Sequence, residues 1–123
     1  YYGNPEWAVR AIFSGYLGWF DGNATNLFPL SDKQEAQRIV KMLDGQDALS
    51  DLIAGAINEQ DYQWAAVLCD YLLAVDPKNK TAMLRKADAL TALAQDKLTT
   101  TARNYYLSSA IELRKQASAL ASE

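Results

Sequence analysis

The chain has 123 residues, half of them hydrophobic, and carries 12 Lys and Arg against 15 Asp and Glu, which leaves a net charge of −3. This length and apolar content suit one packed domain and argue against a disordered chain. The basic residues are dispersed among acids, so no nucleic-acid partner is expected. No apolar run is long enough for a membrane span.

The sequence also bounds the chemistry. It contains no His and a single cysteine, Cys69. Without His it cannot supply a His-based triad, a His general base or the usual zinc ligand set. Cys69 lies in an apolar helical pattern, where we expect a small buried hydrophobe rather than a nucleophile. We therefore expect no catalytic residue, metal site or cofactor in this chain. Because it begins at Tyr1 rather than Met, we expect it to be a segment of something longer.

The first predicted helix covers residues 5–20. Asn4 suits the N-cap, Pro5 suits the first helical position, and apolar residues then recur at spacings of three and four. Its end is unusual, because residues 15–23 combine three aromatics, three glycines, an Asp and an Asn. Gly22 can take positive φ there. Three interpretations are open: another backbone approaches the face of Gly15 and Gly18 closely, the helix ends sharply and presents Trp19, Phe20, Asp21 and Asn23 at its tip, or the stretch is a tight turn between helices.

Residues 24–30 form a connector that is apolar for a loop. Leu27, Phe28 and Leu30 are therefore expected to pack against another surface.

Four further amphipathic helices follow the second one, which Ser31 and Gln34 open as a capping box and Gly45 ends. We expect Asp47 to cap the third helix. The fourth helix should open at Asp61 and end at Asp76-Pro77, and the fifth should start at Asn79 or Lys80. The sixth helix should be capped by Thr99-Thr100-Thr101 and fray from about Gln116. The apolar stripes expected to face the core include Ala36, Ile39, Val40, Leu43, Leu49, Leu52, Ile53, Ala56, Ile57, Trp64, Ala65, Leu68, Tyr71, Leu72, Val75, Met83, Ala87, Leu90, Ala94, Ala102, Tyr105, Tyr106, Ala110 and Leu113. No segment alternates with period two. The fold is predicted to be all-α, with about six helices.

The third to sixth helices resemble two tetratricopeptide-like helical hairpins in series. With Gln46 as the first position of a 34-residue unit, Leu52, Ala65 and Pro77 match the repeat pattern, whereas a second unit from Lys80 retains little beyond Ala87. A stable solenoid needs about three units, so the ends of a two-unit array must be covered. We therefore expect extra helices or a second copy of the chain to cover them.

A polar and aromatic cluster opens the sixth helix at Arg103-Asn104-Tyr105-Tyr106. Arg103 can bind a carboxylate or sulfate bidentately; the alternative is a surface Arg paired with an acid. Tyr105 and Tyr106 sit at core spacing, and their hydroxyls would suit a polar seam between subunits.

Taken together, these stretches resemble the dimerisation domain of bacterial alkyl sulfatases of the metallo-β-lactamase superfamily. The residues that carry the resemblance are Tyr16-Leu-Gly-Trp-Phe-Asp-Gly-Asn23, Asp61-Tyr-Gln-Trp-Ala-Ala66, Leu72-Leu-x-x-Asp-Pro-x-Asn79, Ala102-Arg-Asn-Tyr-Tyr-Leu107 and Glu112-Leu-Arg114. The resemblance covers nearly the whole chain in order, so residues 1–123 are expected to form one helical dimerisation domain.

The resemblance implies a longer parent enzyme that hydrolyses alkyl sulfate esters such as dodecyl sulfate. Two zinc ions would sit in a separate catalytic domain, which this chain would contact, and a sterol-carrier-like domain would follow. An exported, periplasmic parent is also implied. Tyr16, Trp19, Asp21, Asn23 and Arg103 are then candidates to line the substrate pocket or to pack at the domain interface. The candidates for the homodimer surface are Phe13, Leu27, Phe28 and Leu30.

Two other hypotheses remain. A tetratricopeptide-like adaptor would need a polar groove for a partner peptide, and the apolar, aromatic faces expected here favour self-association instead. An independent enzyme is disfavoured by the absence of His and of convergent acids.

Overall fold

The computed structural model describes residues 22–96 and 99–121, and the chain divides into two compact units, residues 1–31 and 32–123. The predicted first helix, with Phe13, Tyr16, Trp19 and Asp21, lies outside the described residues.

The described part of the first unit is a short 3-10 helix, η1 (Ala24–Asn26), with flanking loops. Gly22 has φ +83°, which confirms the predicted left-handed turn. The Asn23 side chain caps η1 by accepting a hydrogen bond from the Thr25 backbone N–H at 3.2 Å. Beyond η1, Phe28 and Leu30 are 60% and 46% exposed.

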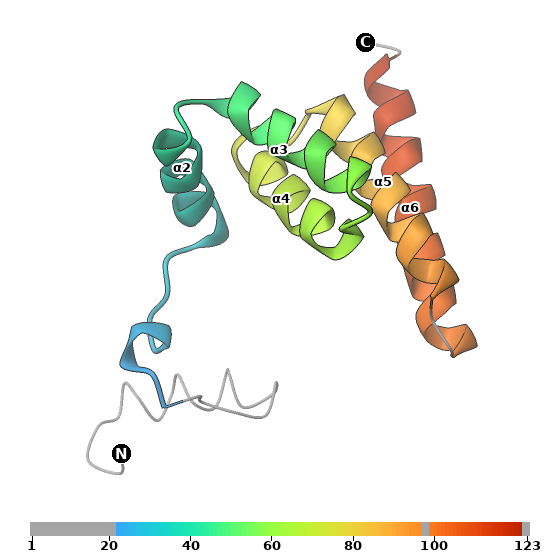
Figure 1. Ribbon diagram of the computed structural model, residues 1–123, viewed down its shortest axis with the longest axis horizontal. Coiled ribbons are helices and arrows are strands. Elements are labelled where there is room, and N and C mark those ends of the chain that lie inside the picture. Colours follow the sequence, from blue (N-terminus) through green and yellow to red (C-terminus); the bar gives the residue numbers. More distant parts are fainter. Residues whose placement is uncertain (1–21, 97–98, 122–123) are drawn as a thin grey trace. The chain divides into compact units, whose positions relative to one another are not determined.

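The second unit contains five α-helices: α2 (Asp32–Met42), α3 (Gln46–Asn58), α4 (Tyr62–Val75), α5 (Lys80–Gln95) and α6 (Thr100–Ala121) (Figure 1). No strand occurs among residues 22–96 and 99–121, so the all-α prediction is confirmed. Helix α4 packs against α2, α3 and α5, whereas α6 packs against α5 alone among these helices. Helix α5 therefore stands between α4 and α6.

Two tight turns connect α2 to α3 and α3 to α4. Asp44 and Gln60 both take positive φ, and each is followed by a backbone N–H that reaches back five residues, Gly45 to Val40 at 2.9 Å and Asp61 to Ala56 at 2.8 Å. This pattern is a Schellman C-cap with a non-glycine residue in the left-handed position. The turn after α2 is so tight that α3 begins at Gln46, and the prediction that Asp47 caps it is wrong.

The remaining helix starts follow the sequence, but one helix end does not. Asn79 caps α5 by accepting from the Ala82 N–H at 2.9 Å, and Thr99 caps α6 by accepting from the Ala102 N–H at 3.2 Å. Helix α6 was expected to fray from about Gln116. It continues instead to Ala121, because Ala117 is buried in the contact with α5 and holds the last turns in place.

Alanine supplies more than half of the buried hydrophobic residues in the described chain. The largest fully buried side chains are Leu49, Ile53, Cys69 and Leu72. The ten buried alanines are Ala36, Ala56, Ala65, Ala66, Ala82, Ala87, Ala89, Ala94, Ala110 and Ala117, and seven of them share one core cluster with those four side chains. Small side chains at the contact allow helix axes to approach closely. The core therefore depends on short distances between helices rather than on bulky side chains.

Three residues predicted to face the core are exposed instead. Leu52, Trp64 and Tyr105 are 46%, 49% and 77% exposed. Each belongs to a helix on which the buried stripe is narrower than the stripe of apolar residues in the sequence. Alanines make up much of the contact between helices, and α6 packs against a single neighbour among helices α2 to α5. Helical periodicity marks the apolar face but not how many helices cover it.

A polar contact also joins α3 to α5. The Arg85 guanidinium of α5 donates to the carbonyl oxygen and the hydroxyl of Ser50 in α3, at 3.0 and 3.1 Å. This partly buried pair ties α3 to α5, which are otherwise in limited contact.

The alanine core predicts that enlarging one of its members is costly. Ala87→Leu adds three carbons at a fully buried position and should lower the free energy of unfolding by about 1–3 kcal/mol. Ala119→Leu, on the exposed face of α6, should change it by less than about 0.5 kcal/mol. Urea denaturation of both variants measures the difference, and equal stabilities would contradict the close-packing interpretation.

Candidate interaction surface

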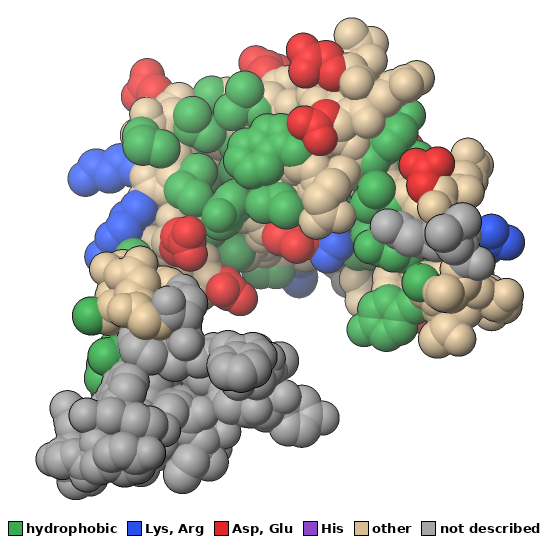
Figure 2. Space-filling view, turned by 60° about the horizontal axis from the view of Figure 1, so that its bottom comes forward, with side chains coloured by type: hydrophobic (Ala, Val, Ile, Leu, Met, Phe, Trp, Pro, Cys, Tyr) green, Lys and Arg blue, Asp and Glu red, His purple; other side chains and the backbone are tan. Residues whose placement is uncertain are grey.

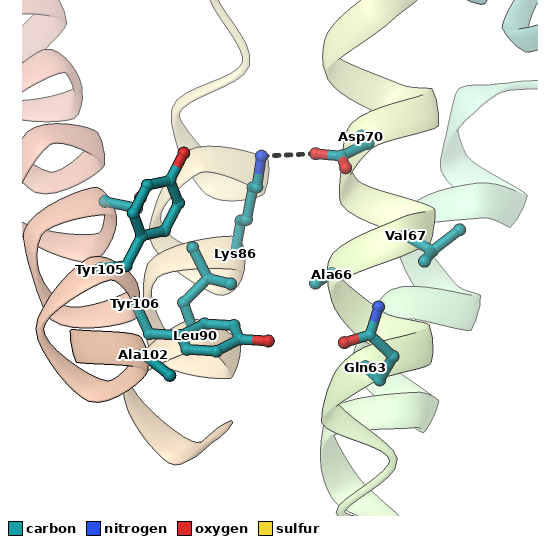
Figure 3. Close-up of a pocket in the computed structure, with 10 residues that line it drawn as sticks. Gln63, Ala66, Val67, Asp70, Lys86, Leu90, Ala102, Tyr105 and Tyr106 are labelled. Atoms are coloured by element: carbon teal, nitrogen blue, oxygen red, sulfur yellow. Dashed lines mark ion pairs between the residues drawn. The ribbon is translucent and has the colours of Figure 1, made fainter. Parts of the chain in front are cut away.

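One hollow among the described residues is a groove between α4 and α6 with α5 as its floor. It has a volume of about 540 Å³ and opens to solvent, and we call it the α4–α6 groove (Figure 3). Its lining residues are Gln63, Ala66, Val67 and Asp70 from α4, Lys86 and Leu90 from α5, and Ala102, Tyr105, Tyr106 and Ser109 from α6. The groove lies between α4 and α6 because both helices pack against α5 while their backbones stay apart.

The floor and walls of this groove are apolar, and its rim is polar. Ala66 and Ala102 leave space between the walls because their side chains end at Cβ, and Leu90 closes the floor. Figure 3 shows the Tyr106 hydroxyl pointing across the groove toward α4. Tyr105 stands beside it on α6 and is the more exposed of the two tyrosines.

One ion pair neutralises the charge of the groove. The Lys86 ammonium of α5 pairs with the Asp70 carboxylate of α4 (Figure 3). These are the only ionisable acid and base that line the groove. It therefore offers apolar area and neutral hydrogen-bonding groups rather than a site for an anion or a cation.

A second hollow of about 490 Å³ lies on the other side of α4, between α4 and α2, and we call it the α2–α4 groove. It shares Val67 and Asp70 with the first groove but is acidic, because Asp32 and Glu35 of α2 also line it. The Tyr71 hydroxyl donates to Glu35 Oε1 at 3.4 Å. Loss of solvent around the phenol raises the pKa of Tyr71, and the neighbouring Glu35 charge and its hydrogen bond raise it further.

Two of the predicted pocket or domain-interface residues lie within the described chain, Asn23 in the first unit and Arg103 in the second. Arg103 is exposed on the first turn of α6 and lines a shallower hollow of about 430 Å³ with Leu107 and residues of α5. Its role in binding a carboxylate or sulfate stays a prediction. Asn23 belongs to the first unit, where its side chain caps η1. Leu27 is half-buried in that unit, whereas Phe28 and Leu30 are exposed.

Cys69 has the predicted role of a small core residue. It is fully buried, and burial, followed by the charge of Asp70, raises the pKa of its thiol to about 12. A thiol with that pKa is not a nucleophile near neutral pH.

No group of three or more potential metal ligands occurs among residues 22–96 and 99–121. In the same part of the chain, no helix is both long and apolar enough to cross a membrane.

Sequence reasoning did not find the α4–α6 groove. It placed Tyr105 and Tyr106 at core spacing, with hydroxyls that would suit a polar seam between subunits, and gave no role to Lys86 or Ser109. Their spacing on separate helices carries no pattern that a single sequence reveals.

Figure 2 shows hydrophobic side chains gathered across one face of the second unit, with acidic side chains at the border. Such a surface is typical of an interaction site.

Comparisons with known proteins identify relatives over most of the chain. A family described as alkyl sulfatase dimerisation matches residues 1–116. The chain is 38% identical over 114 residues to an (R)-specific secondary-alkylsulfatase of Pseudomonas sp., and 37% identical over 113 residues to a linear primary-alkylsulfatase of Pseudomonas sp.. These alignments cover 93% and 92% of this chain but only 17% and 21% of the relatives.

A solved structure agrees with the sequence comparison. The stereoselective inverting sec-alkylsulfatase Pisa1 from Pseudomonas sp. matches with a TM-score of 0.75 and 37% identity, over 88% of this chain and 17% of that protein. The chain thus spans about a fifth of the length of the relatives it matches.

The Tyr71–Glu35 contact predicts a pH dependence. Because the folded state raises the pKa of Tyr71, the hydroxyl contributes stability that is fully present below the ordinary tyrosine pKa of about 10 and is lost as the pH rises through the folded value. Tyr71→Phe should therefore have a lower free energy of unfolding than the unsubstituted chain at pH 7. This margin should be the same at pH 9 and shrink above about pH 10. Urea denaturation at each pH measures the margin, and a margin that grows with pH would contradict the assignment.

Proposed function

Because the chain belongs to the alkyl sulfatase dimerisation family, we propose that it is the helical homodimerisation module of a longer, zinc-dependent alkyl sulfatase. The parent would hydrolyse alkyl sulfate esters, such as dodecyl sulfate, to an alcohol and sulfate. The match to the dimerisation family over residues 1–116 carries this proposal. Relatives named as primary and as secondary alkylsulfatases match about equally well, so the proposal extends to alkyl sulfate esters as a class.

The residues of this chain do not fit a zinc site. It has no His, and the described residues hold no cluster of three potential ligands. Zinc, and the hydrolytic chemistry that it would support, are therefore assigned to a catalytic domain elsewhere in the parent. The contribution of this chain is to hold two copies of the parent together.

The first unit supplies the dimer surface in this proposal. Phe28 and Leu30 are exposed apolar side chains on a connector whose composition is unusual for a loop, and Leu27 lies beside them. We place Phe13 on the same surface. Stable homodimers bury about 2,000 Å² or more, so an exposed apolar connector is a suitable part of such an interface.

The chain should sediment as a dimer over a roughly hundredfold range of concentration. Placing carboxylates at Phe28 and Leu30, as Phe28→Asp with Leu30→Asp, would bury two charges at each contact and should weaken the dimer by about 100-fold or more. Met42→Asp, at an exposed position on α2, should change the dissociation constant by less than about threefold. A double variant that dimerises as tightly as the parent chain would remove this connector from the interface.

A monomer at every concentration would instead contradict self-association by this chain. Binding of peptides by such a monomer would favour the alternative of a tetratricopeptide-like adaptor.

We assign Tyr16, Trp19, Asp21, Asn23 and Arg103 to the contact between this module and the catalytic domain. The capping hydrogen bond of Asn23 supports a packing role at the end of this stretch. Tyr16→Phe in the parent enzyme removes only a hydroxyl and should then change kcat by less than about threefold. A loss of tenfold or more, about 1.4 kcal/mol of barrier, would instead assign the hydroxyl to the sulfate group of the substrate.

A further inference from the structure

The α4–α6 groove has the features of a surface that pairs with a copy of itself. It carries a protruding side chain and a hollow side by side: Tyr105 is 77% exposed at its rim, and Ala66, Ala102 and Leu90 form the hollow. A two-fold interface requires this self-complementarity, because both subunits use the same surface patch. If a residue of the first subunit contacts a given residue of the second, the same contact also forms with the two subunits exchanged. A tyrosine supplies large apolar area with a polar tip, as interfaces favour.

The geometry points to a second copy of this chain as the occupant, with the Tyr105 of each subunit entering the α4–α6 groove of the other. This inference rests on the proposed dimerisation and names a contact surface in the second unit that sequence reasoning did not find. It adds to the connector surface around Phe28 and Leu30 and does not replace it.

Charge separates this groove from its neighbour as a surface for self-association. A two-fold contact brings each residue near its own copy or the copy of a neighbour, so a groove with net charge repels itself. In the α2–α4 groove, Asp32 and Glu35 add negative charge that no base lining that groove offsets. In the α4–α6 groove, Lys86 pairs with Asp70 and the lining is neutral. Of these two grooves, the α4–α6 groove can therefore meet its copy without bringing like charges together.

Packing gives the second argument. Helix α6 spans Thr100–Ala121 and packs against α5 alone among helices α2 to α5, and it leaves Tyr105 exposed at the rim of the groove. The hydroxyls of Ser109 and Tyr105 and the amide of Gln63 can supply hydrogen bonds around an apolar centre. This arrangement, an apolar centre with a polar rim, is the usual anatomy of a protein–protein interface.

The test measures the dimer dissociation constant of the 123-residue chain by sedimentation equilibrium, or by the rate of subunit exchange if dissociation is too weak to detect. Tyr105→Ala should weaken the dimer about tenfold or more, because buried interface tyrosines are among the costliest side chains to truncate. Ile111→Ala is the matched control: this residue is 61% exposed on the same helix but does not line the groove. It should change the constant by less than about threefold.

A charge variant tests the same contact independently. Gln63→Glu gives the neutral groove one negative charge, so two copies would repel, and the dimer should weaken at low salt and recover as salt rises. Gln37→Glu, at an exposed position on α2, is its control. Circular dichroism verifies that each variant is folded.

The outcomes distinguish the two claims. If the unsubstituted 123-residue chain is a dimer and Tyr105→Ala behaves as Ile111→Ala does, the groove contact is wrong and the proposed dimerisation stands. If the unsubstituted chain is a monomer at every concentration, both are wrong. Weakening by Tyr105→Ala and by Gln63→Glu, with unchanged controls, supports the groove contact.

Discussion

The close approach of helices across alanine contacts is the constraint on which the second unit depends. Ten buried alanines surround only a few large buried side chains. A core of this kind gains its apolar burial and dispersion energy from short distances between helices. It therefore tolerates little added volume, and it needs the tight turns at Asp44 and Gln60 that hold successive helices together.

The same small side chains produce the candidate interaction surface. Helix α5 is covered by α4 on one side and by α6 on the other, and the alanines at 66 and 102 leave the space between those two helices open. The ion pair between Lys86 of α5 and Asp70 of α4 lies at this groove and cancels its charge. Close packing inside the unit and an open groove on its surface thus both follow from the use of alanine at the helix contacts. The ion pair keeps that groove neutral.

The proposed role in subunit association follows from the residues that this chain lacks and from those that it exposes. Without His it has no ordinary means to hold zinc, and its one cysteine is buried with a pKa of about 12. What it presents to a partner is apolar and aromatic surface, including Phe28, Leu30 and Tyr105. That combination suits association between subunits, and it matches the family to which the chain belongs.

The sequence by itself determined the all-α class, most helix boundaries and the family. Capping residues such as Asn79 and Thr99 act on their own backbone, and a motif resemblance needs only residues in order. Only the tertiary structure decided that Trp64 and Tyr105 are exposed, that Ala117 extends α6, and that Lys86 meets Asp70 across a groove. Helical periodicity reports which face is apolar, but the number of neighbours that cover that face is a property of how separate helices pack, and no local pattern encodes it.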